Sequence, residues 1–185
     1  MFNSFQSLMN QIDVARFEKI SFEQFKKDYR SINPDANDEL IQSVYDSIKL
    51  PRRATTDSAG YDFYTPIEFR LHPDQNIKIP TGIKVKINPG WVLTIHMRSS
   101  IGFKYGIELS NTTAIIDGDY YNNENNEGHI WIKLTNNDRS VCKTYYAPQG
   151  EAICQGIFLQ YGFAADDNTS ETRKGGFGST NSQNN

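Results

Sequence analysis

The stretch IKIPTGIKVKINPGWVLTIHM (residues 77–97) carries the pattern that decides the fold. Apolar and polar residues alternate in its first half, and a longer apolar run from Trp91 to Met97 follows, which is typical of half-buried β-strands. Thr81-Gly82 and Asn88-Pro89-Gly90 separate these runs with residues that favour turns. Another strand-like run extends from His129 to Leu134. Short strands at short intervals predict an all-β barrel or sandwich.

The first fifty residues follow a helical period instead. Phe22, Phe25 and Tyr29 recur at helical spacing, and Ser21 with Gln24 has the pattern of a capping box at the helix start. A second helix is predicted by the apolar face of Leu40, Ile41, Val44, Tyr45 and Ile48. We expect these two short helices to pack on the outside of the barrel or on a neighbouring subunit.

The division that follows is an N-terminal helical extension (1–47), a β-barrel (48–165) and a flexible C-terminal tail (166–185). The chain has 185 residues and 37% hydrophobic residues, enough for the core of one globular unit. Its formal charge of −3 argues against a general affinity for nucleic acid or for anionic membranes. No apolar run reaches the length of a transmembrane helix, and no signal peptide opens the chain. We therefore expect a cytoplasmic protein.

Cysteine and histidine do not predict a metal site. The two cysteines, Cys142 and Cys154, lie in apolar or aromatic strand-like runs, which favours reduced and buried thiols. His72, His96 and His129 are scattered without the spacing of metal ligands, so ordinary strand or loop positions are expected for them.

The C-terminal segment from Arg173 to Thr180 combines two cations, a cluster of glycines, one aromatic ring and two hydroxyls. Such a segment can wrap a phosphorylated ligand, because glycines let backbone N–H groups approach phosphate and arginine binds two oxygens at once. A disordered polar tail is the alternative interpretation of the same composition.

Four upstream segments also hold more polar chemistry than turns require. They are residues 59–64, 98–106, 111–120 and 150–156. Asp62 lies in a strand-like run, Arg98 opens a hydroxyl-rich stretch suited to phosphate, and Gln155 interrupts an apolar strand. Asp117 and Asp119 follow a strand end, where carboxylates can serve catalysis. Taken singly, each segment has an ordinary alternative, namely a capping acid, a solvated turn or an Asx turn closing a hairpin.

These five segments, in this order and with these gaps, closely resemble the trimeric family of deoxyuridine triphosphate nucleotidohydrolases, the dUTPases. The resemblance spans residues 48–180, and its most specific parts are Ile116-Asp117…Asp119-Tyr120 and Gly175-Gly176-Phe177-Gly178-Ser179. It implies a jelly-roll-like β-barrel that forms homotrimers with active sites shared between subunits. The implied reaction is Mg²⁺-assisted hydrolysis of dUTP to dUMP and pyrophosphate, which limits uracil in DNA and supplies dUMP for dTMP synthesis.

The resemblance also implies a role for each matching residue. Asp117 orients a water for in-line attack on the α-phosphorus, and Asp62 contacts the magnesium ion indirectly, through water. Asn111 hydrogen-bonds uracil, the ring of Tyr120 packs under the deoxyribose, and Phe177 stacks on the base when the tail closes as a lid. The remaining contacts to substrate are expected from Arg98, Ser99, Ser100, Gln155, Arg173, Gly178, Ser179 and Thr180.

Some positions depart from the family pattern. Ala114 replaces a common glycine, so the uracil hairpin must accommodate a β-carbon there, and Ala152 replaces a common arginine. The largest departure is the Asn-rich insertion at residues 121–127, for which a surface loop of inert length variation is expected.

Two other functions stay open. A dCTP deaminase-like enzyme of the same superfamily is disfavoured because the segment around Asp117 lacks the glutamate expected there. A nucleotide-responsive regulatory protein could use the N-terminal helices and the insertion to bind a protein partner.

Overall fold

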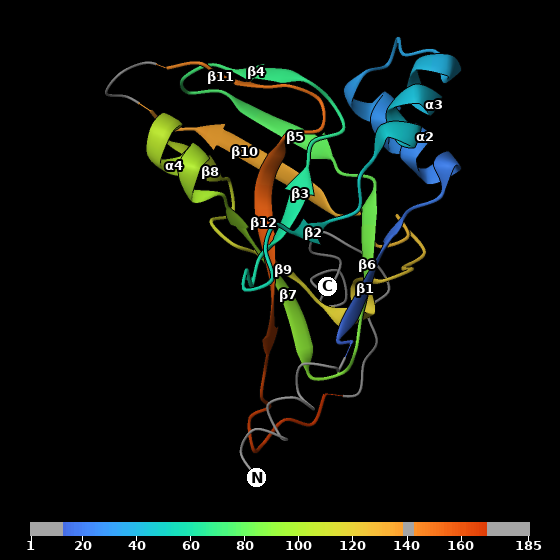
Figure 1. Ribbon diagram of the computed structural model, residues 1–185. Helices are drawn as coiled ribbons and strands as arrows, with labels where there is room; N and C mark the ends of the chain where they lie inside the picture. Colours follow the sequence, from blue (N-terminus) through green and yellow to red (C-terminus); the bar gives the residue numbers. More distant parts are fainter. Residues whose placement is uncertain (1–12, 139–142, 170–185) are drawn as a thin grey trace, which may run out of the picture.

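The computed structural model describes residues 13–138 and 143–169, in which antiparallel strands surround one core and two helices lie at one side (Figure 1). A five-stranded sheet has the order β2 (Arg52–Arg53), β3 (Tyr61–Tyr64), β12 (Ala152–Gln160), β7 (Trp91–Met97), β9 (Ala114–Ile116). A three-stranded sheet joins β5 (Asn76–Pro80), β10 (Trp131–Asn136) and β8 (Ile107–Leu109). Two pairs complete the described strands: β1 (Ala15–Lys19) with β6 (Ile83–Ile87), and β4 (Phe69–Leu71) with β11 (Tyr145–Ala147). The predicted all-β, jelly-roll-like fold is confirmed.

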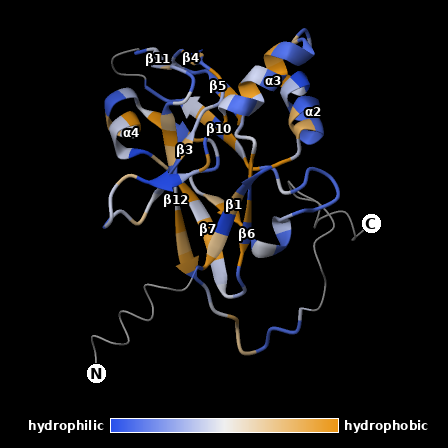
Figure 2. Cartoon of the chain, turned by 45° about the vertical axis from the view of Figure 1, so that its right-hand side comes forward, coloured by the Kyte–Doolittle hydropathy of each residue, from blue (hydrophilic) through white to orange (hydrophobic). Residues whose placement is uncertain are grey.

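Alternation of burial along the strands follows the sequence pattern. In β6, Ile83, Val85 and Ile87 are buried while Lys86 is exposed, as period-two alternation requires. Figure 2 shows the same division, with hydrophobic residues on β7 and β12 and hydrophilic residues over much of α2 and α3. The core that results also includes Phe63 and Cys154.

Both predicted helices are present, as α2 (Phe22–Ile32) and α3 (Asp38–Ser47). The Ser21 hydroxyl accepts a hydrogen bond from the Gln24 N–H at 3.1 Å, which confirms the predicted N-cap. The side chain of Gln24 does not complete the capping box, because it donates to Asp28 instead. The N–H of Ser21 donates to the carboxylate of Glu127, which lies 106 residues later in the chain.

Strand β1 is an element that the sequence analysis did not predict. It pairs antiparallel with β6, from Ala15 opposite Ile87 to Lys19 opposite Ile83. The Phe17 ring lies between 5.4 and 5.7 Å, centroid to centroid, from the rings of Tyr61, Phe63 and Phe158. The N-terminal extension is therefore part strand, and its Phe17 side chain packs, partly buried, against the barrel core.

The thiol of Cys154 is free and fully buried, as predicted, and burial raises its pKa. Cys142 lies outside the described residues. Within the two described ranges, no helix is long and apolar enough to cross a membrane.

Candidate functional site

Three of the predicted segments meet on the five-stranded sheet. Gln155 of β12 pairs with Asp62 of β3 on one side and with His96 of β7 on the other. Directly paired residues present their side chains to the same face of a sheet, so the three side chains form one row. Gly60 leaves room for the observed conformation of Gln155, since a β-carbon there would lie 2.8 Å from its side-chain oxygen.

Arg98 follows β7 and reaches the same row. Its Nε lies 3.4 Å from Asp62 Oδ1, and its Nη1 donates to the carbonyl of Ala152 at 3.0 Å. The Asp62 side chain is 15% exposed, which strengthens this ion pair relative to one in open water. The structure thus brings together Asp62, Arg98 and Gln155, which the sequence analysis predicted from three separate segments.

Ser99 and Ser100 open the short helix α4 (Ser99–Tyr105), and both are exposed. This helix was not predicted from the sequence. Gly106 ends the helix with a positive φ of 64°. The first turn of a helix has backbone N–H groups without helical partners, so the hydroxyls of both serines lie beside groups that favour anions.

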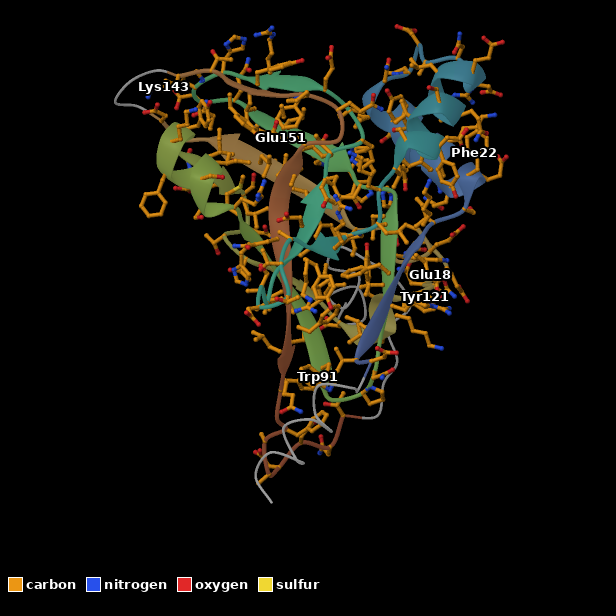
Figure 3. The ribbon with its side chains drawn as sticks, in the orientation of Figure 1. Glu18, Phe22, Trp91, Tyr121, Lys143 and Glu151 are labelled. Atoms are coloured by element: carbon orange, nitrogen blue, oxygen red, sulfur yellow. The ribbon has the colours of Figure 1, made fainter. Side chains whose placement is uncertain are left out.

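Asp117 lies at a different place on the same sheet. It follows β9, whose Ile116 pairs with Leu93 near the start of β7, whereas Asp62 lies in the row of His96. Four residues along β7 and three strand spacings separate the two carboxylates, on the order of 20 Å for a flat sheet. Asp117 lines a cavity of about 540 Å³ with Asn88, Trp91 and Tyr161 among its other residues. Figure 3 labels Trp91 at this end of the sheet.

A larger cavity, of about 630 Å³, contains Asn111 and Ala114. Asn111 is exposed in the turn between β8 and β9, and Ala114 pairs with Ile95 inside β9. Ala114 is not among the residues with positive φ, so the strand accommodates its β-carbon without strain. The other residues of the cavity include Ser31, Ile32, Lys78, Ser110, Trp131 and Lys133.

Tyr120 ends the 3₁₀ turn η1 (Gly118–Tyr120) and is 7% exposed. Its hydroxyl donates to the carbonyl of His129 at 2.9 Å and accepts from the side-chain amide of Asn126 at 2.8 Å. The ring is therefore held by two hydrogen bonds from residues that follow it in the chain.

The insertion at residues 121–127 forms a loop with several internal hydrogen bonds from its asparagine side chains. The side-chain amide of Asn123, which is buried, donates to the carbonyl of Tyr120 and to Asn126 Oδ1. The side-chain oxygen of Asn123 accepts from the N–H groups of Asn125 and Asn126. Asparagine side chains thus form hydrogen bonds with backbone N–H and C=O groups of this loop. They can do so because a side-chain amide has the same donor and acceptor as a peptide group.

The loop also binds the N-terminal extension. The Glu127 carboxylate accepts from the Ser21 N–H at 2.9 Å and from the Ser21 hydroxyl at 2.5 Å. Burial acts to raise the pKa of Glu127, but these hydrogen bonds and the charge of Lys84 outweigh it and keep the pKa below its ordinary value. The hydroxyl of Tyr121 donates to Glu18 on β1 at 2.8 Å (Figure 3).

His129 is a residue whose part in this region the sequence did not indicate. It is fully buried, its Nε2 accepts from the Gly82 N–H at 2.8 Å, and its Nδ1 lies 2.6 Å from Asp28 Oδ2. Because Nε2 accepts, the proton of the neutral ring is on Nδ1, which donates to Asp28. Burial lowers the pKa of His129 despite the opposing effect of Asp28.

Acidification should destabilise the fold through His129. Its pKa is lower in the folded state than the ordinary value of about 6.5, so the unfolded chain takes up a proton first as pH falls. Below about pH 6.5 the free energy of unfolding should drop by up to ~1.4 kcal/mol per pH unit from this group. Thermal melting between pH 7.5 and 5.0 measures it. His129→Gln does not titrate and can still donate to Asp28 and accept from Gly82, so its pH slope should be shallower; parallel slopes would contradict the assignment.

Gly128 has a backbone that a side chain would not tolerate. Its φ is 82°, and a β-carbon would lie 2.6 Å from the carbonyl oxygen of Tyr120. Gly128→Ala should therefore lower the free energy of unfolding by more than ~2 kcal/mol, through the positive φ and the backbone clash together. Gly90→Ala is the matched control, since φ is 83° there and the added carbon meets nothing within 4 Å. Urea unfolding of both variants checks the difference; equal losses would mean that the clash is relieved.

The predicted contacts from the tail fall on Arg173, Phe177, Gly178, Ser179 and Thr180. All five lie outside the described residues, so these assignments stay predictions.

Comparison with known proteins gives one consistent result. The dUTPase family model matches residues 46–182. The deoxyuridine 5'-triphosphate nucleotidohydrolase of Lactococcus lactis subsp. lactis is 40% identical over 136 residues, which cover 72% of this chain and 88% of the relative. That of Tolumonas auensis is 34% identical over 149 residues, covering 76% and 93%. The crystal structure of dUTPase from Streptococcus mutans superimposes with a TM-score of 0.59 at 33% identity, covering 80% of this chain and 97% of that one. The chain therefore belongs to the dUTPase family.

Proposed function

We propose that this protein hydrolyses dUTP to dUMP and pyrophosphate, limiting uracil in DNA and supplying dUMP for dTMP synthesis. The observation that carries the proposal is the meeting of Asp62, Arg98 and Gln155 on one sheet, because a cation, an amide and a carboxylate suit a metal-bound triphosphate. The free, buried thiol of Cys154 supports a reducing compartment, and we place the reaction in the cytoplasm.

In the proposed reaction, Asp117 orients a water and accepts its proton. The water oxygen bonds to the α-phosphorus, the bond from that phosphorus to the bridging oxygen breaks, and pyrophosphate leaves. A carboxylate is a weak base at neutral pH, so the reaction depends on neutralisation of the phosphate charge. Arg98 supplies part of it from this chain, with Gln155 as a neutral donor beside it.

A magnesium ion bound with the triphosphate supplies the rest of that neutralisation. The residues present fit an ion held mainly by substrate and water: among the described residues, no group of three His, Cys, Asp or Glu side chains could hold a metal. Asp62 is already paired with Arg98, so it would bind a water of the ion rather than the ion itself.

A homotrimer with shared active sites is part of the proposal. Its support is the separation of Asp117 from Asp62 and Arg98 within one chain, on the order of 20 Å. Three copies could place Asp117 of one against the phosphate-binding row of another. Mixing Asp117→Asn with Arg98→Ala under conditions of subunit exchange should then restore activity that neither variant has alone.

Selectivity is assigned to Asn111 for the uracil edge and Tyr120 for the sugar. A base whose hydrogen-bonding edge differs from that of uracil would leave polar groups of the pocket unpaired. The ring of Tyr120, held against the sugar, would leave no room for a 2′-hydroxyl. The proposal extends to Phe177 as the ring that stacks on the base.

Release of pyrophosphate from dUTP, dCTP, dTTP and UTP with magnesium tests the proposal. Fast release from dUTP alone is expected. Formation of dUTP or dUMP from dCTP would instead favour a deaminase, and release from none of the four would move the function to nucleotide-responsive binding.

A further inference from the structure

Helix α2 lies outside the residues that match the family, yet it contacts the segment that carries Asn111 and Tyr120. It packs against β5, and three separate links join it to residues 111–131. The first two links end on His129, whose carbonyl accepts from Tyr120, and on the cavity of Asn111, and the third ends on the loop whose Asn126 binds Tyr120.

The first link is the pair of Asp28, which is partly exposed, and the fully buried His129. Asp28 Oδ2 accepts from His129 Nδ1 at 2.6 Å and from the Gln24 side-chain amide at 2.9 Å. The carbonyl of His129 accepts the hydroxyl of Tyr120, and the His129 ring lies 5.2 Å from the ring of Trp131. Because His129 is fully buried in a close-packed environment, a shift of Asp28 would move His129 and, with it, Tyr120 and Trp131.

The second link is the cavity that contains Asn111. Ser31 and Ile32, at the end of α2, line it together with Trp131. One wall of the cavity beside the uracil-binding position is therefore built by a helix from the N-terminal extension.

The third link is the double hydrogen bond from Ser21 to Glu127. Glu127 closes the loop in which Asn126 donates to the hydroxyl of Tyr120. The start of α2 therefore fixes the loop that holds Tyr120, while its middle fixes His129.

We propose that Asp28 and His129 are positioning residues for nucleoside recognition, through which α2 sets the places of Tyr120 and Trp131 and so the discrimination between deoxyribose and ribose nucleotides. The inference rests on the proposed function. A ring that excludes a 2′-hydroxyl does so only while it is held close to the sugar, and small displacements admit the larger ligand.

The test compares kcat/KM for dUTP with that for UTP in three variants of the full chain. Asp28→Ala removes the acceptor of His129 and should lower the dUTP-to-UTP ratio about tenfold, mainly through a lower KM for UTP. Asp28→Asn should restore the ratio, because both hydrogen bonds reach a single oxygen that asparagine also has. Lys26→Ala is the control, since Lys26 is also on α2 and its loss breaks the 2.6 Å contact with Asp38 of α3 without touching the links.

A wild-type ratio in Asp28→Ala would overturn the inference. If that variant does not fold, Ser21→Gly decides: glycine remains a tolerable N-cap but loses the hydroxyl that binds Glu127, and about a threefold lower ratio is expected. An unchanged ratio there would overturn the inference as well. Failure of the proposed function is distinct, because the wild-type protein would then hydrolyse neither nucleotide.

Discussion

Replacing Asp117 by asparagine should lower kcat for dUTP by at least ~1,000-fold while nucleotide binding is retained. Asparagine keeps the shape of the side chain but cannot accept the proton of the attacking water. Asp117 lines an open cavity at the end of β9 rather than the core, so the fold should survive. Turnover of dUTP and calorimetric binding of a non-hydrolysable analogue measure the two effects.

Glu124→Gln is the control for this experiment. Glu124 is an exposed acid in the loop that follows Tyr120, and its neutralisation should leave kcat unchanged. Near-normal turnover by Asp117→Asn would remove Asp117 from the reaction and leave the water without an assigned base.

Truncation after Thr172 should reduce kcat/KM for dUTP by about 100- to 1,000-fold and leave the melting temperature unchanged. It removes Arg173 and the hydroxyls of Ser179 and Thr180, which are assigned to phosphate, and the ring of Phe177. We expect the core to survive, because β12 ends at Gln160 and the last described residues, 161–169, are all exposed.

A shorter truncation separates the assigned contacts from chain length. Removal of residues 181–185 alone should keep full activity, because no contact is assigned to them. An unfolded chain after truncation at Thr172 would show that the tail is structural. Full activity in that variant would remove the tail from the active site.

The sequence predicted those elements whose signal is local. The alternation at Ile83–Ile87 gives β6, and Ser21 caps α2 because its hydroxyl reaches an N–H three residues away. Asp62 and Gln155 were proposed as site residues through the order of the segments, whereas the pairing of β3 with β12, which places them opposite each other, was not predicted.

The elements that were missed depend on partners far away in the chain. Strand β1 has one large apolar residue, Phe17, and its pairing is with β6. The role of His129 depends on its hydrogen bond to Asp28, which lies 101 residues earlier in the chain. No sequence spacing predicts a contact between residues so far apart. Residues 99–105 contain a glycine and lack a side-chain cap, so helix α4 is not predicted by propensity.

The pairing of β1 with β6 has a consequence for solubility. Strand β6 is an alternating apolar strand whose backbone groups, in the described part of the chain, are paired by β1. A protein that began at residue 46, where the family match begins, would expose this edge to the strands of other molecules. Open edges of this kind promote edge-to-edge aggregation. The charges of Lys84 and Lys86 would then be the features of the strand that oppose such pairing. The N-terminal segment thus acts within its own molecule as protection against self-association.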